Sequence, residues 1–452
     1  MLDKHKNIAK DIIDLAHQYG ADMASVSVAN STSFQVDVRE KKIESLQESG
    51  SSGIHITVSK NRRRSTVSSN DLRIDTLAPL IRSSLESLPF MGEDLYYSLP
   101  NPKLQGRAKA DLKVLDPEFD AIDSEKKVSY PFHLEELSEN KDLRLRTEQS
   151  FYSDSISHIV HADSNGFLEG VTKTLFSLGI SMVADDNSSC LDVASSSTNI
   201  SRKQTDGWYS TSRFYKNLSS SNEIVKKACE RTLRKLGAKK PPSQEVPVVF
   251  SAEMAQSFFG KIASALMGEN IFRKHSFLIN KLHEDIANQN INLIDDPLIP
   301  GKMGSRHFDS EGVKAKPLVL IENGVLKNFM LSTYSGNKLG MESTGHSGGI
   351  SNLILKNGKY TEEELISSVK NGLYLTYMSG QGANILTGDF SRGGQGIWIR
   401  NGKLEEPVSE FTIASNFHEM LKNLIMIANN TDERSSILTP SIKIKKMSVS
   451  GK

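Results

Sequence analysis

Residues 300–352 read PGKMGSRHFDSEGVKAKPLVLIENGVLKNFMLSTYSGNKLGMESTGHSGGISN. Two apolar runs, Val319–Glu322 and Val325–Met330, predict strands. The Asn-Gly pair between them predicts a tight hairpin, because a type I′ turn needs positive φ at both central residues. Polar, glycine-rich segments flank the hairpin at 306–312 and 343–349. Loops held by a rigid hairpin are common places for binding and catalysis, so the stretch predicts either a functional site or two surface loops around an ordinary hairpin.

The composition is that of a soluble globular protein. The chain has 452 residues, of which 37% are hydrophobic and 24% are charged. That length predicts two or three domains with ample chain for a buried core. With 55 Lys and Arg against 54 Asp and Glu, the formal net charge is +1, which gives no general attraction to nucleic acid. The Arg62-Arg63-Arg64 run lies where a hairpin turn is expected, which favours a solvated turn over a nucleic-acid contact.

The sequence contains no signal for export or for a membrane span. The N-terminal residues lack an apolar core of signal-peptide length, and no run approaches the roughly 18 apolar residues that a spanning helix needs. Two cysteines, Cys190 and Cys229, are too few for a disulfide framework or a zinc knuckle. We therefore expect a cytoplasmic protein that does not bind membranes.

The N-terminal half shows the same pattern twice, a helix followed by an antiparallel meander and a second helix. In the first unit, helices at 4–19 and 70–88 enclose strands at 23–29, 33–39, 43–49 and 53–59. In the second, helices at 120–138 and 222–236 enclose strands at 143–152, 155–163, 167–184 and 188–198, with a helix break near Pro131. Residues 99–109, which carry two prolines, predict a linker between the units. We expect a structural duplication, although no residues match between the two units.

The clearest domain boundary is Lys239-Lys240-Pro241-Pro242-Ser243, because paired prolines cannot continue a helix. The predicted fold class is α+β with two domains. The expected N-terminal domain is residues 1–238, with units at 1–98 and 111–238, and the expected C-terminal domain, mainly antiparallel β, is residues 245–452.

The C-terminal half begins with a predicted strand at 245–250 and a long apolar helix, Ala252–Leu266, which is expected to be buried on most sides. Short strands and glycine turns follow, with helices expected at 361–370 and 417–428.

Four ordered motifs in this half resemble a known family. They are FDSEGV at 308–313, LSTYSGNKLG at 331–340, STGHSGGISN at 343–352 and GQGANILTGDFSRGGQGIWIRNG at 380–402. Together they closely resemble the TldD/PmbA metallopeptidase family, which also has an old label as a modulator of DNA gyrase. The PmbA branch, also called TldE, is the closer match.

The metallopeptidase branch of that family carries an HExxxH pattern on the buried helix and a cysteine ligand near the C-terminus. A zinc peptidase needs ligands that converge on one ion and a carboxylate that activates the bound water. The resemblance places Gly260, Lys261 and Ala265 at the His, Glu and His positions, and it places the cysteine within 434–439, where the sequence has no Cys. We therefore expect no catalytic residue and no metal in this chain, with zinc bound by a partner subunit.

The resemblance thus implies the PmbA-like subunit of a metallopeptidase complex that cleaves unfolded peptides, such as leader peptides and antitoxins. A TldD-like subunit would form a heterodimer with this chain and supply the zinc, while this chain would contribute peptide binding and assembly. A homodimer is expected when the partner is absent. The alternative is a non-enzymatic homodimer that captures peptides without cleaving them. Binding to nucleic acid is disfavoured by the charge balance.

We expect the peptide to add as a strand to a sheet edge lined by residues 346–351 and 379–384, where glycines permit close backbone approach. The candidate peptide-binding residues are His346, Gly348, Gly349, Gln381, Gly382, Asp389 and Arg392. Asp309 and Glu311, in the DxEG turn of the family, are expected to orient loops.

Overall fold

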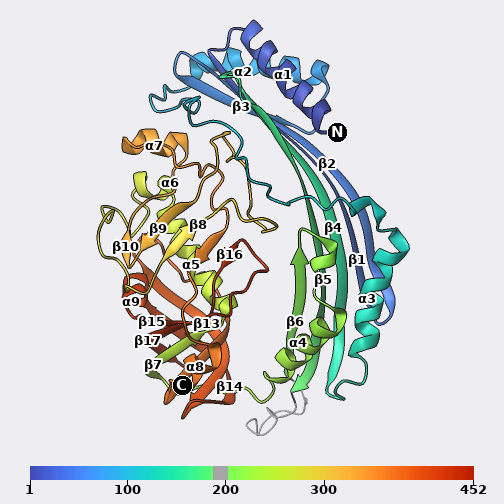
Figure 1. Cartoon of the computed structure of the whole chain (residues 1–452), viewed down its shortest axis with the longest axis vertical. Coiled ribbons are helices and arrows are strands. Elements are labelled where there is room, and N and C mark those ends of the chain that lie inside the picture. The colour runs from blue at the N-terminus through green and yellow to red at the C-terminus, as the bar shows by residue number, and fades with distance from the viewer. Residues whose placement is uncertain (187–201, 452) are drawn as a thin grey trace.

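The computed structural model describes residues 1–186 and 202–451. A long, curved antiparallel sheet forms one side of the molecule, and the C-terminal domain lies along its concave side (Figure 1). The fold class predicted from the sequence, α+β with mainly antiparallel sheets, is confirmed. Among the described helices, none is both long and apolar enough to cross a bilayer.

The N-terminal sheet joins two helix–meander–helix units. Its strand order is β3-β2-β1-β4-β5-β6, and β1 pairs antiparallel with β4 from Ser25↔Asp163 to Val38↔Ser150. The strands are β1 Met23–Arg39, β2 Lys42–Lys60, β3 Arg63–Ser69, β4 Leu145–Asp163, β5 Leu168–Asp186 and β6 Arg202–Ser212. The helices are α1 Leu2–Gln18, α2 Ile74–Ser87, α3 Ser124–Ser138 and α4 Ser221–Leu233. The predicted duplication is therefore present as one continuous sheet.

The strands of this sheet are longer than the sequence pattern predicts. The sequence predicts turns near 30–32 and 50–52, whereas β1 and β2 run through both positions. The hydroxyls of Ser31 and Ser51 form a hydrogen bond of 2.9 Å across the two strands, so the short polar residues there belong to a solvated sheet face and not to a turn.

The second unit also differs from the prediction. Pro131 lies inside α3 without ending it. The pattern missed β6, and the predicted strand at 188–198, with Cys190, lies outside the described residues.

The C-terminal domain contains a closed barrel and a smaller sheet. The barrel order is β14-β13-β12-β7-β17, with β14 pairing back to β17 and β15 added to β17. Its strands are β7 Gln244–Phe250, β12 Asn371–Ser379, β13 Asp389–Arg400, β14 Lys403–Asn416, β15 Leu424–Ile427 and β17 Ile442–Ser450. The smaller sheet, in the order β10-β9-β8-β11-β16, contains β8 Leu293–Asp295, β9 Leu318–Glu322, β10 Val325–Leu326, β11 Leu353–Leu355 and β16 Ile437–Leu438.

The predicted hairpin turn is confirmed, because Asn323 has φ 49° and Gly324 has φ 82°. The strand that follows is shorter than predicted and ends at Leu326. The helix expected at 417–428 is instead a short helix followed by strand β15. The short helices of this domain are α6 Gly268–Phe272, α7 Thr333–Leu339, α8 Glu362–Ser367 and α9 Phe417–Lys422.

Helix α5, Ala252–Leu266, has the bounds that the sequence predicts. Ser251 caps its first turn by accepting a hydrogen bond from the Met254 N–H. One face is fully buried and contributes Phe258 and Phe259 to the core of the C-terminal domain. The opposite face is only half-buried, and we call it the α5 stripe; its residues are Glu253, Gln256, Ser257, Gly260, Lys261 and Ser264. The helix is therefore less enclosed than its apolar composition predicts.

Candidate functional site

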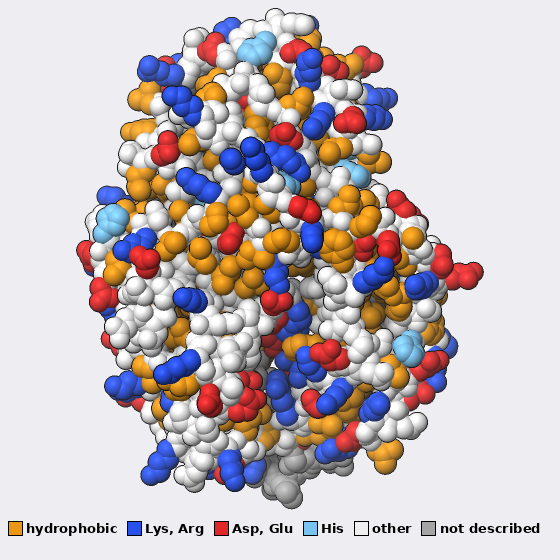
Figure 2. Space-filling view, in the orientation of Figure 1, with side chains coloured by type: hydrophobic (Ala, Val, Ile, Leu, Met, Phe, Trp, Pro, Cys, Tyr) orange, Lys and Arg blue, Asp and Glu red, His pale blue; other side chains and the backbone are white. Residues whose placement is uncertain are grey.

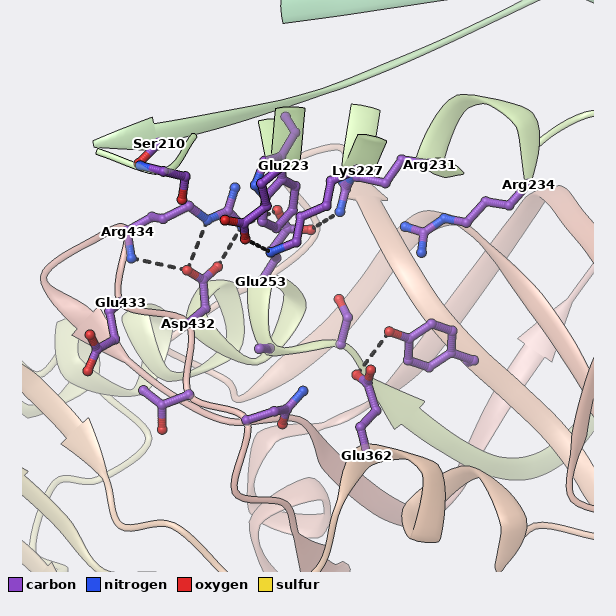
Figure 3. Close-up of a pocket in the computed structure, with 17 residues that line it drawn as sticks. Ser210, Glu223, Lys227, Arg231, Arg234, Glu253, Glu362, Asp432, Glu433 and Arg434 are labelled. Carbon is purple, nitrogen blue, oxygen red and sulfur yellow. Dashed lines mark hydrogen bonds and ion pairs between the residues drawn. The ribbon is translucent and has the colours of Figure 1, made fainter. Parts of the chain in front are cut away.

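A cavity of about 620 Å³ lies between the two domains. Helix α4 and strand β6 of the N-terminal domain form one wall, and the first turn of α5 and the loop 430–434 form the other (Figure 3). The space-filling view shows a hollow between the domains with acidic and basic side chains along it (Figure 2). We call this cavity the interdomain cleft.

A network of ion pairs crosses the interdomain cleft at the start of α5. Glu253 accepts hydrogen bonds from Arg231 of α4 at 2.7 Å and from Arg434 at 2.6 Å. Arg231 also pairs with Asp206 of β6, and Arg434 also pairs with Asp432. Burial alone would lower the pKa of Arg231, but the charges of Glu253 and Asp206 raise it. The carboxylate of Glu253 thus ties the C-terminal domain to α4.

The indole of Trp208 on β6 lies among the cations of this network. The guanidinium carbon of Arg434 stands 3.5 Å from the centre of the indole ring, and Arg231 and Lys227 lie at 5.0 and 4.9 Å. Cations at such distances are attracted by the negative face of an aromatic ring. Trp208 therefore adds a second contact between the domains beside the Glu253 ion pairs.

The α5 stripe meets the C-terminal segment 434–439. A Cβ atom at Gly260 would lie 3.1 Å from the Cδ1 atom of Ile437, so these positions are in contact. Ala265 does not share this face: it is fully buried, and five residues along a helix turn the side chain by roughly 140°.

The residues at this contact do not fit a zinc site. Gly260 and Ile437 offer no ligand atom, and Lys261 would place a positive charge beside a divalent cation. Within residues 1–186 and 202–451, no three His, Cys, Asp or Glu residues gather in a group that could hold a metal ion.

The carboxylates of the DxEG turn hold three loops together. Asp309 accepts hydrogen bonds of 2.9 Å from the N–H groups of Glu311, Val313 and Ser347, and Glu311 accepts one from Thr333 at the start of α7. Burial raises the pKa of both carboxyl groups, and the N–H donors partly offset that rise. These are bonds that orient loops.

His346 lies beneath the surface, contrary to the peptide contact that the sequence suggests. Its side chain is 2% exposed, and Nε2 bonds to Asp295 at 3.1 Å while Nδ1 bonds to Thr344. Both ring nitrogens are therefore engaged inside the protein, and we leave His346 out of the proposed peptide site. Gly349 is half-buried with φ 93°, and a Cβ atom added there would meet no atom within 4 Å.

Two of the predicted glycines lie close to other groups of the protein itself. A side chain at Gly382 would overlap the carbonyl oxygen of Ser391, and one at Gly348, which has φ 85°, would overlap the hydroxyl of Ser310. Substitution at either position would disturb the loop itself, so it cannot report on peptide binding. Such glycines allow close backbone approach, but here the approaching group is internal.

Of the other predicted residues, Arg392 contacts helix α5. Its guanidinium donates to the Ser257 hydroxyl of the α5 stripe at 3.2 Å and to the Ser379 carbonyl oxygen at 3.4 Å. Asp389 accepts a hydrogen bond from Thr387 instead of pairing with Arg392. Gln381 is exposed in the loop between β12 and β13. The segments 346–351 and 379–384 therefore belong to different parts of the domain: the first packs on Asp295 and the second ends the β12–β13 hairpin.

Sequence reasoning missed Arg231, Glu253 and Arg434. They come from three segments that are far apart in the chain, and each is an ordinary charged residue in its local pattern. The only local signal is the acidic residue in the first turn of α5, which the helix dipole alone would explain.

Three family models match this chain. Those for the first, central and C-terminal domains of the PmbA/TldA metallopeptidases match residues 24–88, 117–236 and 243–451. The chain is 28% identical to a metalloprotease PmbA homolog from Buchnera aphidicola, over 98% of this chain and 96% of that protein. It is 28% identical to the metalloprotease PmbA of Escherichia coli O157:H7, over 95% and 93% of the two chains.

A solved structure has the same fold. It is a protein of Bacteroides thetaiotaomicron, named as a candidate modulator of DNA gyrase, with a TM-score of 0.91 and 29% identity over 100% of this chain and 99% of that one. The family matches cover most of the chain in order, from the first strand of the N-terminal sheet to the last strand of the barrel. This chain belongs to the PmbA/TldD metallopeptidase family as a PmbA-like member.

Proposed function

We propose that this chain is the subunit without metal in a two-subunit peptidase that cleaves unfolded peptides. One observation carries the proposal: α5 keeps a half-buried stripe that begins in the interdomain cleft, but Gly260 and Lys261 stand where the family resemblance places His and Glu. A TldD-like partner would supply zinc and the carboxylate that activates water. This chain would help to hold the peptide and to assemble the complex.

An edge of the barrel supports strand addition by the peptide. Strand β12 pairs with β13 as far as Ser379↔Gly393, whereas its pairing with β7 ends at Leu375↔Phe250. Beyond that point, one edge of β12 carries no paired strand within the described ranges, and Tyr377 there is 46% exposed. Free N–H and C=O groups on such an edge bind peptides of varied sequence. The edge leads directly to Gln381, so we retain residues 379–384 as the proposed peptide contact, with Arg392 as support.

The alternative is a homodimer that binds flexible peptides without cleaving them. Gly260 and Lys261, in place of a His and a Glu, favour this alternative equally. The two functions differ only in whether a zinc-bearing partner joins the chain.

Assembly tests the proposed function. Mixed in equal amounts with a TldD-like subunit from the same organism, the chain should sediment as a heterodimer, and by itself it should sediment as a homodimer of twice 50.0 kDa. A lone species of 50.0 kDa at micromolar concentration, in the presence and absence of the partner, would contradict the proposal.

A further inference from the structure

Arg234 is the cation in the interdomain cleft that has no carboxylate partner among the described residues. It follows the last turn of α4, its side chain is half-buried, and it lines the cavity (Figure 3). Its Nε atom is buried without a hydrogen-bond partner, and its guanidinium forms no ion pair within the described ranges. Burial lowers the pKa of Arg234, and the nearby charge of Arg231 lowers it further. The charges of Asp206 and Glu253 offset part of this fall, but both carboxylates are already paired with Arg231, and neither forms an ion pair with Arg234 in the described ranges.

The carboxylates around Arg234 are engaged elsewhere. Glu253 is shared by Arg231 and Arg434, and Glu223 pairs with Lys227 at 2.8 Å. Glu362 accepts hydrogen bonds from the hydroxyls of Tyr374 at 2.9 Å and Ser441 at 2.5 Å, and Glu433 pairs with Lys302. An arginine left in this state is costly, because a guanidinium taken from water normally needs hydrogen-bond acceptors in return.

We propose that Arg234 binds a carboxylate of the peptide in the interdomain cleft, either its C-terminal carboxylate or an Asp or Glu side chain. The proposal rests on the peptide-binding function above and names the chemistry that the cleft selects. A guanidinium presents its N–H donors as a planar fork that matches the two oxygens of a carboxylate. The cavity of about 620 Å³ has room for the end of a peptide or for one acidic side chain with its neighbours.

Strand addition binds only the backbone of a peptide and does not select its sequence. The cleft would therefore add a preference for peptides that carry a carboxylate. The hydroxyls of Ser210 and Ser251 also line the cavity and have O–H donors for the same peptide. In this arrangement, Glu253 pairs with Arg231 and Arg434, and Glu223 pairs with Lys227, so that among the described residues of the cleft a single guanidinium remains for the ligand.

Binding of three peptide pools to the full chain tests this proposal. Each pool contains fluorescent random-sequence peptides of about ten residues, made without Asp or Glu except where stated. The first pool has a free C-terminal carboxylate, the second is amidated, and the third is amidated but contains one internal Glu. We expect the parent chain to bind the first pool with a Kd about tenfold lower than that of the second. A pair of one charge-assisted hydrogen-bonded donor and acceptor provides an affinity difference of about that size. Tight binding of the third pool would show that Arg234 also binds the carboxylate of a Glu side chain.

Arg234→Met should abolish the preference for carboxylate and leave the binding of the amidated pool unchanged. The matched control is Lys226→Met, which removes the same charge from an exposed position on the same helix, where the side chain is 75% exposed. The control should keep the tenfold preference. The melting temperature of Arg234→Met should stay within about 2 °C of the parent, because no ion pair of the fold is lost. A large fall in melting temperature would show instead that Arg234 stabilises the fold.

The outcomes separate this proposal from the function on which it rests. If the parent chain binds all three pools equally, or if Arg234→Met keeps the preference, the carboxylate site is wrong while peptide binding stands. If no pool binds, then peptide binding by this chain fails, and the carboxylate site fails with it.

Discussion

Adding a TldD-like, zinc-bearing subunit should raise cleavage of unfolded peptide at least about a hundredfold above the rate of this chain alone. The reason is chemical: a zinc-bound water and a catalytic carboxylate together supply acceleration of that order or more, and Gly260 and Lys261 do not provide the His and Glu of a zinc peptidase. The measurement is the release of a fluorescent fragment from an unfolded peptide by this chain, by the partner and by their mixture.

A control separates assembly from chemistry in that experiment. Replacing the Glu of the partner's HExxxH helix by Gln should abolish cleavage by the mixture while the two subunits still sediment together. Cleavage by this chain without any partner would contradict the proposed function. If this chain binds the peptide but neither this chain, nor the partner, nor their mixture cleaves it, the result would favour the non-enzymatic homodimer instead.

Phe258→Ala should lower the free energy of unfolding by about 3–5 kcal/mol. The side chain is 0% exposed, and its ring lies 5.7 Å from that of Phe417 and 5.0 Å from that of Phe259, centre to centre. Truncation would leave a cavity under α5, the helix whose opposite face reaches the interdomain cleft. Urea unfolding of the parent and the variant measures the loss.

The matched control for that variant is Phe90→Ala, which makes the same substitution at a side chain that is 90% exposed. It should change the free energy of unfolding by no more than about 0.5 kcal/mol. A loss below about 1 kcal/mol for Phe258→Ala would show that α5 does not depend on this contact.

The elements that the sequence predicts well are those with strong local signals. Helix α5 has a Ser cap at its start and an uninterrupted apolar face, and the Asn323–Gly324 turn needs two residues with positive φ. Strand ends in the N-terminal sheet are harder to place, because Ser31 and Ser51 satisfy each other across β1 and β2 and look like turn residues when each is read alone. The closure of the barrel through β14 and β17 depends on pairing between distant segments, which no local pattern encodes.

The candidate site is only partly predictable for the same reason. The sequence indicates the importance of α5, but Glu253 and Arg434 are 181 residues apart in the chain, and Arg231 reaches them only because the two domains pack together. Glycine motifs predict that another group approaches the backbone closely, but they do not show which group it is. At Gly382 that group is the carbonyl of Ser391. His346 is a reasonable candidate in a glycine-rich loop, yet its bond to the buried Asp295 makes it part of the interior.

Zinc content decides most directly whether this chain is a supporting subunit or a catalytic one. The measurement is elemental analysis of the purified chain after mild chelation, with the TldD-like subunit treated in the same way as the control. We expect close to no zinc in this chain, because Gly260, Lys261 and Ala265 provide no ligand atoms for it, and about one zinc in the partner. About one zinc for each copy of this chain would contradict the account.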